Sequence, residues 1–216
     1  MKITHLGHAC VLVETGGARI LIDPGAFTKG FEELTDLDAV LVTHQHIDHL
    51  DVERLPLLLE ANPQARLLTE AEAAAELDKV GIDAQPLHVG DEVEFGEARV
   101  SGVGGIHAEI DPAIARIGNV GLLVRSSGEP TFFHPGDAYA ATPEGVDVLA
   151  LPLNAPWAKI SETTKFVAEI RPGRLFPVHD ALLGPTGRPL YLRVLGSLLP
   201  EGCELQDLAG AGATDF

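Results

Sequence analysis

The stretch Thr43–His49 constrains this chain more than any other, because it gathers metal-binding side chains in one turn. Its sequence, Thr-His-Gln-His-Ile-Asp-His, holds three histidines and one aspartate within six positions. The apolar run Val40–Val42 precedes it and predicts a buried strand, so the turn lies where a strand ends. Imidazole nitrogen and carboxylate oxygen suit zinc at about 2.0–2.2 Å. A polar turn with coincidental histidines is the alternative, but His-x-His-x-Asp-His is far more specific than a lone His-x-His.

Other predicted strand ends carry groups of the same kind, namely Asp23, His107, Asp137 and His179. Glycines directly before His107 would allow the backbone to approach a crowded cleft closely. The two oxygens of a carboxylate such as Asp137 can bind two cations at once, which an imidazole cannot do.

These five elements, in this order, resemble the signature of the metallo-β-lactamase-fold hydrolases, and the resemblance extends through nearly the whole chain. It is closest to the short single-domain subgroup that is similar to ascorbate-phosphate lactonase-like proteins. The resemblance implies an α/β (α+β) chain folded as a four-layer αββα sandwich, in which helices flank two mixed sheets. The metals are expected at one edge of the two sheets.

The resemblance also implies two adjacent cation sites with a shared ligand. The first site consists of His44, His46 and His107, the second of Asp48, His49 and His179, and Asp137 bridges both. Asp48 and Asp137 are the expected catalytic residues. Two cations about 3.5–4 Å apart can share a hydroxide and polarise the substrate. The expected function is therefore hydrolysis of a small ester, lactone or phosphodiester.

Three further residues are expected to support the ligands or to contact substrate. Asp23 precedes Pro24-Gly25, where its carboxylate could orient a ligand histidine without binding metal. His8 lies in a Gly-His-Ala segment that, in the subgroup, sits near the metal cleft. Trp157 is the only tryptophan, and core filling and pocket lining are equally compatible with its position. His134 is left unassigned, and ordinary structural roles are favoured for His5 and His88.

Zinc is the first choice of metal, and manganese or iron(II) also fit the nitrogen and oxygen ligands. The rival functions are a metal-dependent nuclease, a redox protein of the same fold and a non-catalytic member. A nuclease is disfavoured because the formal net charge of -17 repels phosphate backbones. We expect a small-molecule substrate and no nucleic-acid partner, and a homo-oligomer is compatible with the sequence.

The chain is expected to form one domain, residues 1–216, because no serine- or glycine-rich linker divides it. No signal peptide and no membrane-spanning run is visible, so the expected location is the cytoplasm. Cys10 and Cys203 lack any Cys-x-x-Cys spacing, and free thiols are favoured over a disulfide. Residues 203–208 predict a last strand, and the small, polar tail 209–216 predicts a frayed end.

Overall fold

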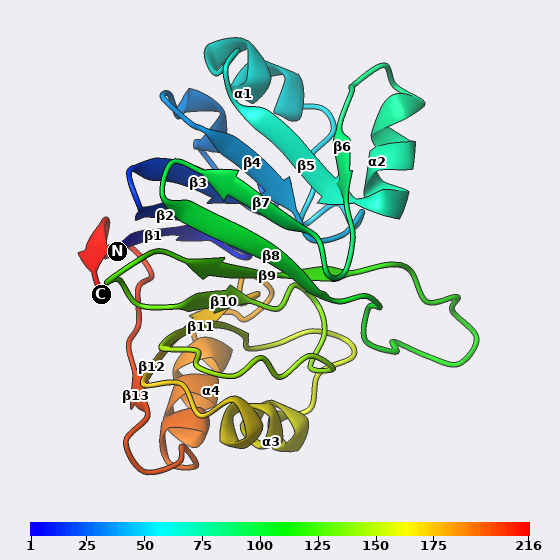
Figure 1. Cartoon of the computed structure of the whole chain (residues 1–216). Coiled ribbons are helices and arrows are strands. Elements are labelled where there is room, and N and C mark those ends of the chain that lie inside the picture. The colour runs from blue at the N-terminus through cyan, green and yellow to red at the C-terminus, as the bar shows by residue number, and fades with distance from the viewer.

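The computed structural model describes every residue from Met1 to Phe216, and its centre is two sheets that face each other (Figure 1). The first sheet has the strand order β14-β1-β2-β3-β4-β5-β6. Its strands are β1 (Lys2–Gly7), β2 (Cys10–Thr15), β3 (Ala18–Ile22), β4 (Ala39–Val42), β5 (Arg66–Glu70), β6 (Gln85–Leu87) and β14 (Thr214–Asp215). Neighbours are antiparallel from β14 to β3 and parallel from β3 to β6.

The second sheet repeats this plan, with the order β13-β12-β11-β10-β9-β8-β7. Its strands are β7 (Glu92–Phe95), β8 (Ala98–Gly104), β9 (Val120–Arg125), β10 (Phe132–His134), β11 (Val148–Pro152), β12 (Arg174–Val178) and β13 (Glu204–Leu205). Neighbours are antiparallel from β7 to β10 and parallel from β10 to β13. Both sheets are therefore mixed, as predicted.

Helices cover the outer face of each sheet (Figure 1). A short 3-10 helix, η1 (Phe31–Glu33), and the helices α1 (Leu55–Ala61) and α2 (Ala71–Asp78) pack on the first sheet. The helices α3 (Ile160–Ile170) and α4 (Gly187–Gly196) pack on the second. This is the four-layer αββα arrangement, so the predicted fold class is confirmed.

The sequence periodicity explains why the layers form. Along β2, Val11 and Val13 pack between the sheets, whereas Cys10 and Leu12 pack under the helices, as the two-residue repeat of a strand requires. The central parallel strands β4 and β11 are buried along their whole length because both of their faces are covered. Helix α3 buries Thr163, Phe166, Val167 and Ile170 at helical spacing against the second sheet.

The C-terminal tail differs from the prediction of a frayed end. Thr214 and Asp215 form β14, which pairs with Ile3 and Lys2 of β1. Phe216 continues this contact, because its amide donates to the Met1 carbonyl at 2.9 Å and the Arg174 guanidinium lies 4.5 Å from its ring centre. The tail is ordered by pairing with the other end of the chain, which composition alone does not reveal. The predicted last strand is also shorter, with only Glu204–Leu205 pairing as β13.

None of the helices combines the length and the apolar character that crossing a membrane requires.

The packing between the sheets supports a stability prediction. Phe132 is fully buried there, and its ring stacks on Phe176 with ring centres 6.2 Å apart. Phe132→Ala should lower the free energy of unfolding by roughly 3–5 kcal/mol, because a cavity replaces the ring. Urea denaturation would measure the change, with Leu57→Ala, at a position 54% exposed, as the control. Equal stabilities for the two variants would contradict the described core.

Candidate metal centre

All of the predicted metal-binding side chains meet at one edge of the sandwich. Thr43–His49 follow β4, Asp137 follows β10, and His179 follows β12. The parallel pairings β3–β4 and β11–β12 carry the carboxyl ends of neighbouring strands to the same edge. His107 reaches this edge from the end of β8. The fold itself thus joins residues that lie far apart in the sequence.

The first group contains His44, His46 and His107, whose candidate ligand atoms all lie within 4.8 Å of one another. His44 Nε2 is 3.0 Å from His46 Nδ1. The His46 and His107 rings stand nearly perpendicular, with centres 4.7 Å apart. The geometry brings together the three residues predicted for the first site.

The second group contains Asp48, His49 and His179, and it also includes His8. His179 Nε2 lies 3.3 Å from Asp48 Oδ2, and His8 Nε2 lies 2.9 Å from the same oxygen. The backbone amide of Ala181 donates to His8 Nδ1 at 3.4 Å. In that tautomer His8 Nε2 carries the proton and donates to Asp48, so His8 orients this carboxylate.

Asp137 lies between the two groups. Its Oδ1 is 3.2 Å from His49 Nε2, and its Oδ2 is 3.0 Å from His179 Nε2. The same Oδ2 is 3.6 Å from His107 Nε2, a member of the first group. The carboxylate therefore has the position that the bridging role requires.

In three of the candidate ligand imidazoles, protein groups hold the outer nitrogen, which leaves the inner nitrogen for a cation. His49 Nδ1 is 2.7 Å from Asp23 Oδ2, His179 Nδ1 is 2.7 Å from the Asn154 carbonyl, and His107 Nδ1 is 2.7 Å from the Ala108 carbonyl. Such contacts fix the tautomer and the direction of a metal-binding ring.

The inner atoms are the ones without partners. Buried side-chain atoms that make no hydrogen bond include Nε2 of His49, His107 and His179 and Oδ1 of Asp137. Buried polar atoms are almost always paired, so a group of unpaired ones that face each other calls for a ligand. Imidazole nitrogens and carboxylate oxygens in this arrangement fit divalent cations.

Asp23 joins the ligand turn to β3 and lies outside the ligand groups. It is fully buried, its Oδ1 accepts from the Thr43 amide, and its Oδ2 accepts from the Thr43 hydroxyl, each at 2.8 Å. The position agrees with the predicted supporting role for His49. The backbone after Asp23 packs directly against the ligand turn, because a Cβ added to Gly25 would lie 1.8 Å from the Asp48 carbonyl oxygen.

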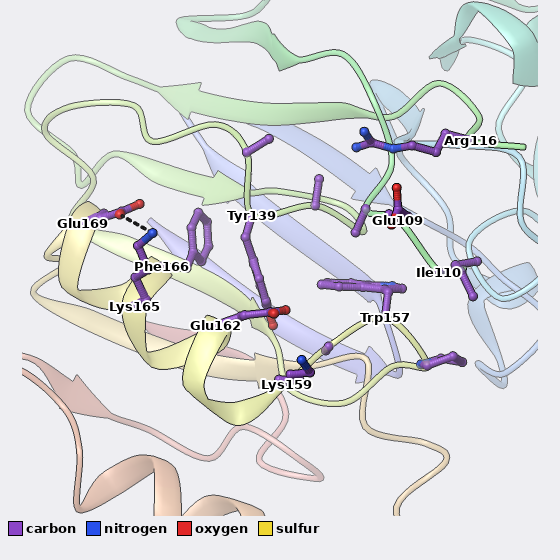
Figure 2. A pocket seen from close by; sticks show the side chains of 15 residues that line it. Glu109, Ile110, Arg116, Tyr139, Trp157, Lys159, Glu162, Lys165, Phe166 and Glu169 are labelled. Atoms are coloured by element: carbon purple, nitrogen blue, oxygen red, sulfur yellow. Dashed lines mark ion pairs between the residues drawn. The ribbon is translucent and has the colours of Figure 1, made fainter. Parts of the chain in front are cut away.

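Trp157 fills both roles that the sequence left open. It is 8% exposed, and its Nε1 donates to Asp137 Oδ2 at 3.0 Å. One part of the indole also lines a pocket beside the metal centre (Figure 2). Trp157 therefore packs and orients the Asp137 carboxylate at the same time.

The remaining histidines lie outside the ligand set. His134 is buried, and its Nε2 is 3.0 Å from the Ala9 carbonyl. His5 Nε2 is 2.9 Å from the His8 carbonyl, and exposed His88 pairs with Asp91 in a turn. The structural roles expected for His5 and His88 agree with these contacts.

Sequence reasoning missed two residues that hold the ligands. Asn119 is buried and uses its Oδ1 to accept from the Asp137 amide at 2.9 Å. Arg116 donates from Nε at 2.9 Å and from Nη2 at 2.6 Å to the His107 carbonyl. A polar amide directly before the strand Val120–Arg125 was a signal for Asn119, whereas Arg116 lies in a loop without any pattern.

Burying these titratable groups next to one another shifts their pKa values. Burial alone would lower the pKa of His179, but the nearby carboxylates of Asp137 and Asp48 outweigh it and raise this pKa to about 9. Burial likewise opposes ionisation of Asp48, but hydrogen bonds from His179 and His8 hold its pKa well below the usual range. Burial lowers the pKa of His44. These shifts keep Asp48 and Asp137 ionised and His179 protonated at neutral pH.

Comparisons with known proteins agree with this architecture. A family model described as a beta-lactamase superfamily domain matches residues 2–179. Protein Rv0786c of Mycobacterium tuberculosis is 47% identical over 192 residues, which cover 88% of this chain and 89% of that protein. A protein of Alkaliphilus metalliredigens named a metal-dependent hydrolase is 28% identical, with 83% of this chain and 85% of that protein covered. The crystal structure of the metallo-beta-lactamase fold protein YhfI from Bacillus subtilis has a TM-score of 0.73 at 15% identity and covers 100% of this chain and 99% of that one.

The raised pKa of His179 leads to a prediction about metal binding. A cation must displace the proton that His179 carries below about pH 9, so apparent affinity should increase with pH up to that value. Burial opposes protonation of His49, but Asp137 and Asp23 outweigh it and raise the pKa of His49 as well, so the gain is at least roughly tenfold per pH unit. Calorimetry of zinc binding in buffers of different ionisation enthalpy would measure both affinity and proton release. An affinity that is constant over this range, without proton release, would contradict the protonated state.

The contacts of Asp23 lead to a second prediction. Asp23→Ala should weaken metal binding by roughly 10–100-fold, because His49 loses the group that orients its ring. Competition with a chromogenic chelator would measure the affinity, and far-ultraviolet circular dichroism would check that the sheets persist. The control is Asp38→Ala, since the exposed Asp38 carboxylate accepts only from the Arg19 amide. Unchanged affinity in Asp23→Ala would leave Asp23 with no role beyond ending β3.

Proposed function

The chain belongs to the beta-lactamase superfamily, and on that basis we propose that it is a hydrolase dependent on two divalent metal ions. The proposed substrate is a small molecule with an ester, lactone or phosphodiester bond. The observation that carries the proposal is the set of unpaired buried atoms of His49, His107, His179 and Asp137, which face one another. Relatives named metal-dependent hydrolases support the reaction class.

The proposed ligands are His44, His46 and His107 for one ion, Asp48, His49 and His179 for the other, and Asp137 for both. When bound, two such ions lower the pKa of a water held between them and polarise the substrate oxygen. The nearness of Asp137 to members of both groups supports the shared position. Zinc is the first choice because of the imidazole ligands, and manganese or iron(II) suit the two carboxylates.

The protein groups around these ligands have separate tasks. Asp48 is kept ionised and is aimed by His8, so it can accept a hydrogen bond from the attacking water. Trp157 donates to Asp137 Oδ2 and fixes the plane of that carboxylate. Asp23 and the Asn154 carbonyl keep His49 and His179 turned towards the centre. These contacts pre-organise the site before substrate arrives.

The net charge and the free thiols support the proposed substrate class and cellular location. The formal net charge of -17 disfavours a nucleic-acid substrate and an anionic membrane surface. Cys10 and Cys203 are both free, which suits a reducing compartment, and the proposed location is the cytoplasm. The proposed partner is therefore a small molecule.

The proposal predicts the behaviour of Asp137→Ala. This variant should lose at least one ion and should lose activity by more than roughly 100-fold, since changes in groups around a metal ligand already cost 10–100-fold. Elemental analysis would count the ions. Zinc- and manganese-loaded protein would be assayed with a chromogenic phosphodiester, lactone and thioester.

The matched control is Asp83→Ala, because Asp83 is exposed and makes no side-chain hydrogen bond. It should retain both ions and full activity. Two tightly held ions in Asp137→Ala would refute the bridging role. Two ions in the wild type with no turnover of any substrate would favour the redox or non-catalytic alternatives.

A further inference from the structure

A pocket of about 570 Å³ lies directly beside the metal centre. Its walls are the segments after two proposed ligands, which begin with Ala108 and Ala138, together with helix α3 and the loop before it. Figure 2 shows Trp157, Tyr139 and Phe166 along its floor. Its volume is within the range of small-molecule sites. We refer to it as the aromatic pocket.

The aromatic pocket adjoins the metal centre through Trp157 and through residues next to His107. The Trp157 indole lines the pocket, and its Nε1 lies 3.0 Å from Asp137 Oδ2. The Trp157 and His107 rings meet edge to face, with centres 6.2 Å apart. No proposed ligand lines the pocket itself, but Ala108, Ile110 and Arg116 line both the pocket and a small hollow that His46 and His107 also line. A molecule in the pocket can therefore extend along these residues towards the proposed ligands.

The floor is a row of aromatic rings in fixed positions. Tyr139 meets Trp157 edge to face at 4.9 Å and stacks on Phe166 at 4.8 Å. The Tyr139 hydroxyl donates to the Pro152 carbonyl at 2.6 Å and lies 3.0 Å from the Thr163 hydroxyl, which fixes its ring. A further ring can extend such a row by edge-to-face or offset contact, and a rigid row loses little entropy when it binds one.

Small side chains keep the space above this row open. The alanines of the lining are Ala108, Ala138, Ala140 and Ala158. Ala140 is exposed at the pocket wall, where a larger residue would extend into the space without disturbing the core. The open volume of the pocket therefore depends on small side chains such as Ala140, which the core does not require to be small.

The charged rim does not select for net charge. It carries three basic groups, Arg116, Lys159 and Lys165, and three acidic ones, Glu109, Glu162 and Glu169. Lys165 pairs with Glu169 at 3.7 Å, whereas Arg116 and Lys159 form no ion pair (Figure 2). Because the opposite charges are equal in number, ligands with polar substituents of either sign can bind. The aromatic floor therefore determines which ligands bind well.

We propose that the aromatic pocket binds a ring next to the bond that is cleaved, so that the substrates are aromatic esters, lactones or phosphodiesters. This inference rests on the proposed function, because the cleaved bond is assigned to the metal centre. The ring lies on Trp157 and Tyr139, and the polar end of the molecule reaches the ions.

Direct binding of three carboxylates tests the inference without any turnover. Phenylacetate, cyclohexylacetate and acetate share the group that would reach the ions and differ in the part that would enter the pocket. Calorimetry with the zinc-loaded protein should give phenylacetate roughly tenfold tighter binding than acetate, because a ring leaves water. Phenylacetate should also bind more tightly than cyclohexylacetate, since only the flat ring matches the aromatic row.

Two variants test whether the preference for phenylacetate arises in the aromatic pocket. Ala140→Leu should reduce the preference for phenylacetate over acetate to near one, because leucine fills the pocket. The matched control is Ala168→Leu, on the exposed face of α3 and outside the pocket lining, which should keep the preference. Trp157 is the only tryptophan, so its fluorescence should change with phenylacetate in the wild type and in the control.

Equal affinities of phenylacetate and acetate in the wild type would overturn the inference, as would an equal loss of preference in both variants. Tighter binding of cyclohexylacetate would overturn the aromatic class. These outcomes are separable from the proposed function: turnover without ring preference refutes only the pocket assignment, and ring preference without turnover refutes only the hydrolase.

Discussion

The burial of Asp137 among histidines is the interaction on which the rest of this structure depends. A carboxylate that is 3% exposed is costly to bury unless it is paired, and Asp137 contacts His49, His107 and His179. Those histidines arrive from β4, β8 and β12, so this cluster holds the edges of both sheets together. The same closeness aligns the side chains that would bind cations.

The backbone at this edge adopts conformations that side chains usually avoid. His8, Asp23 and His179 have φ values of 49°, 51° and 57°. Non-glycine residues in this region are strained and tend to cluster at functional sites. Each of the three lies at a strand end and turns a polar side chain towards the centre. The His179 amide donates to the His8 carbonyl at 2.8 Å, which joins the first sheet to the second at the site.

The pocket beside the centre relates the metal chemistry to substrate choice. Trp157 touches the proposed bridging carboxylate with its N–H and the pocket with its ring. The side chain that orients Asp137 is thus also the one that the proposed substrate would contact.

The strand β4 and the candidate ligand turn could be predicted from sequence because each is local. Val40–Val42 are contiguous apolar residues, and His44–His49 carry their chemistry in one continuous turn. The four layers were implied by the resemblance of the whole motif set to a known family. The contacts between residues distant in sequence could not be predicted from local patterns and are visible only in the folded chain. Asn119 on the Asp137 amide, Trp157 on its carboxylate and β14 on β1 lie between segments that no local pattern connects. Their partners are set by how the two sheets stack, and that depends on the whole core at once.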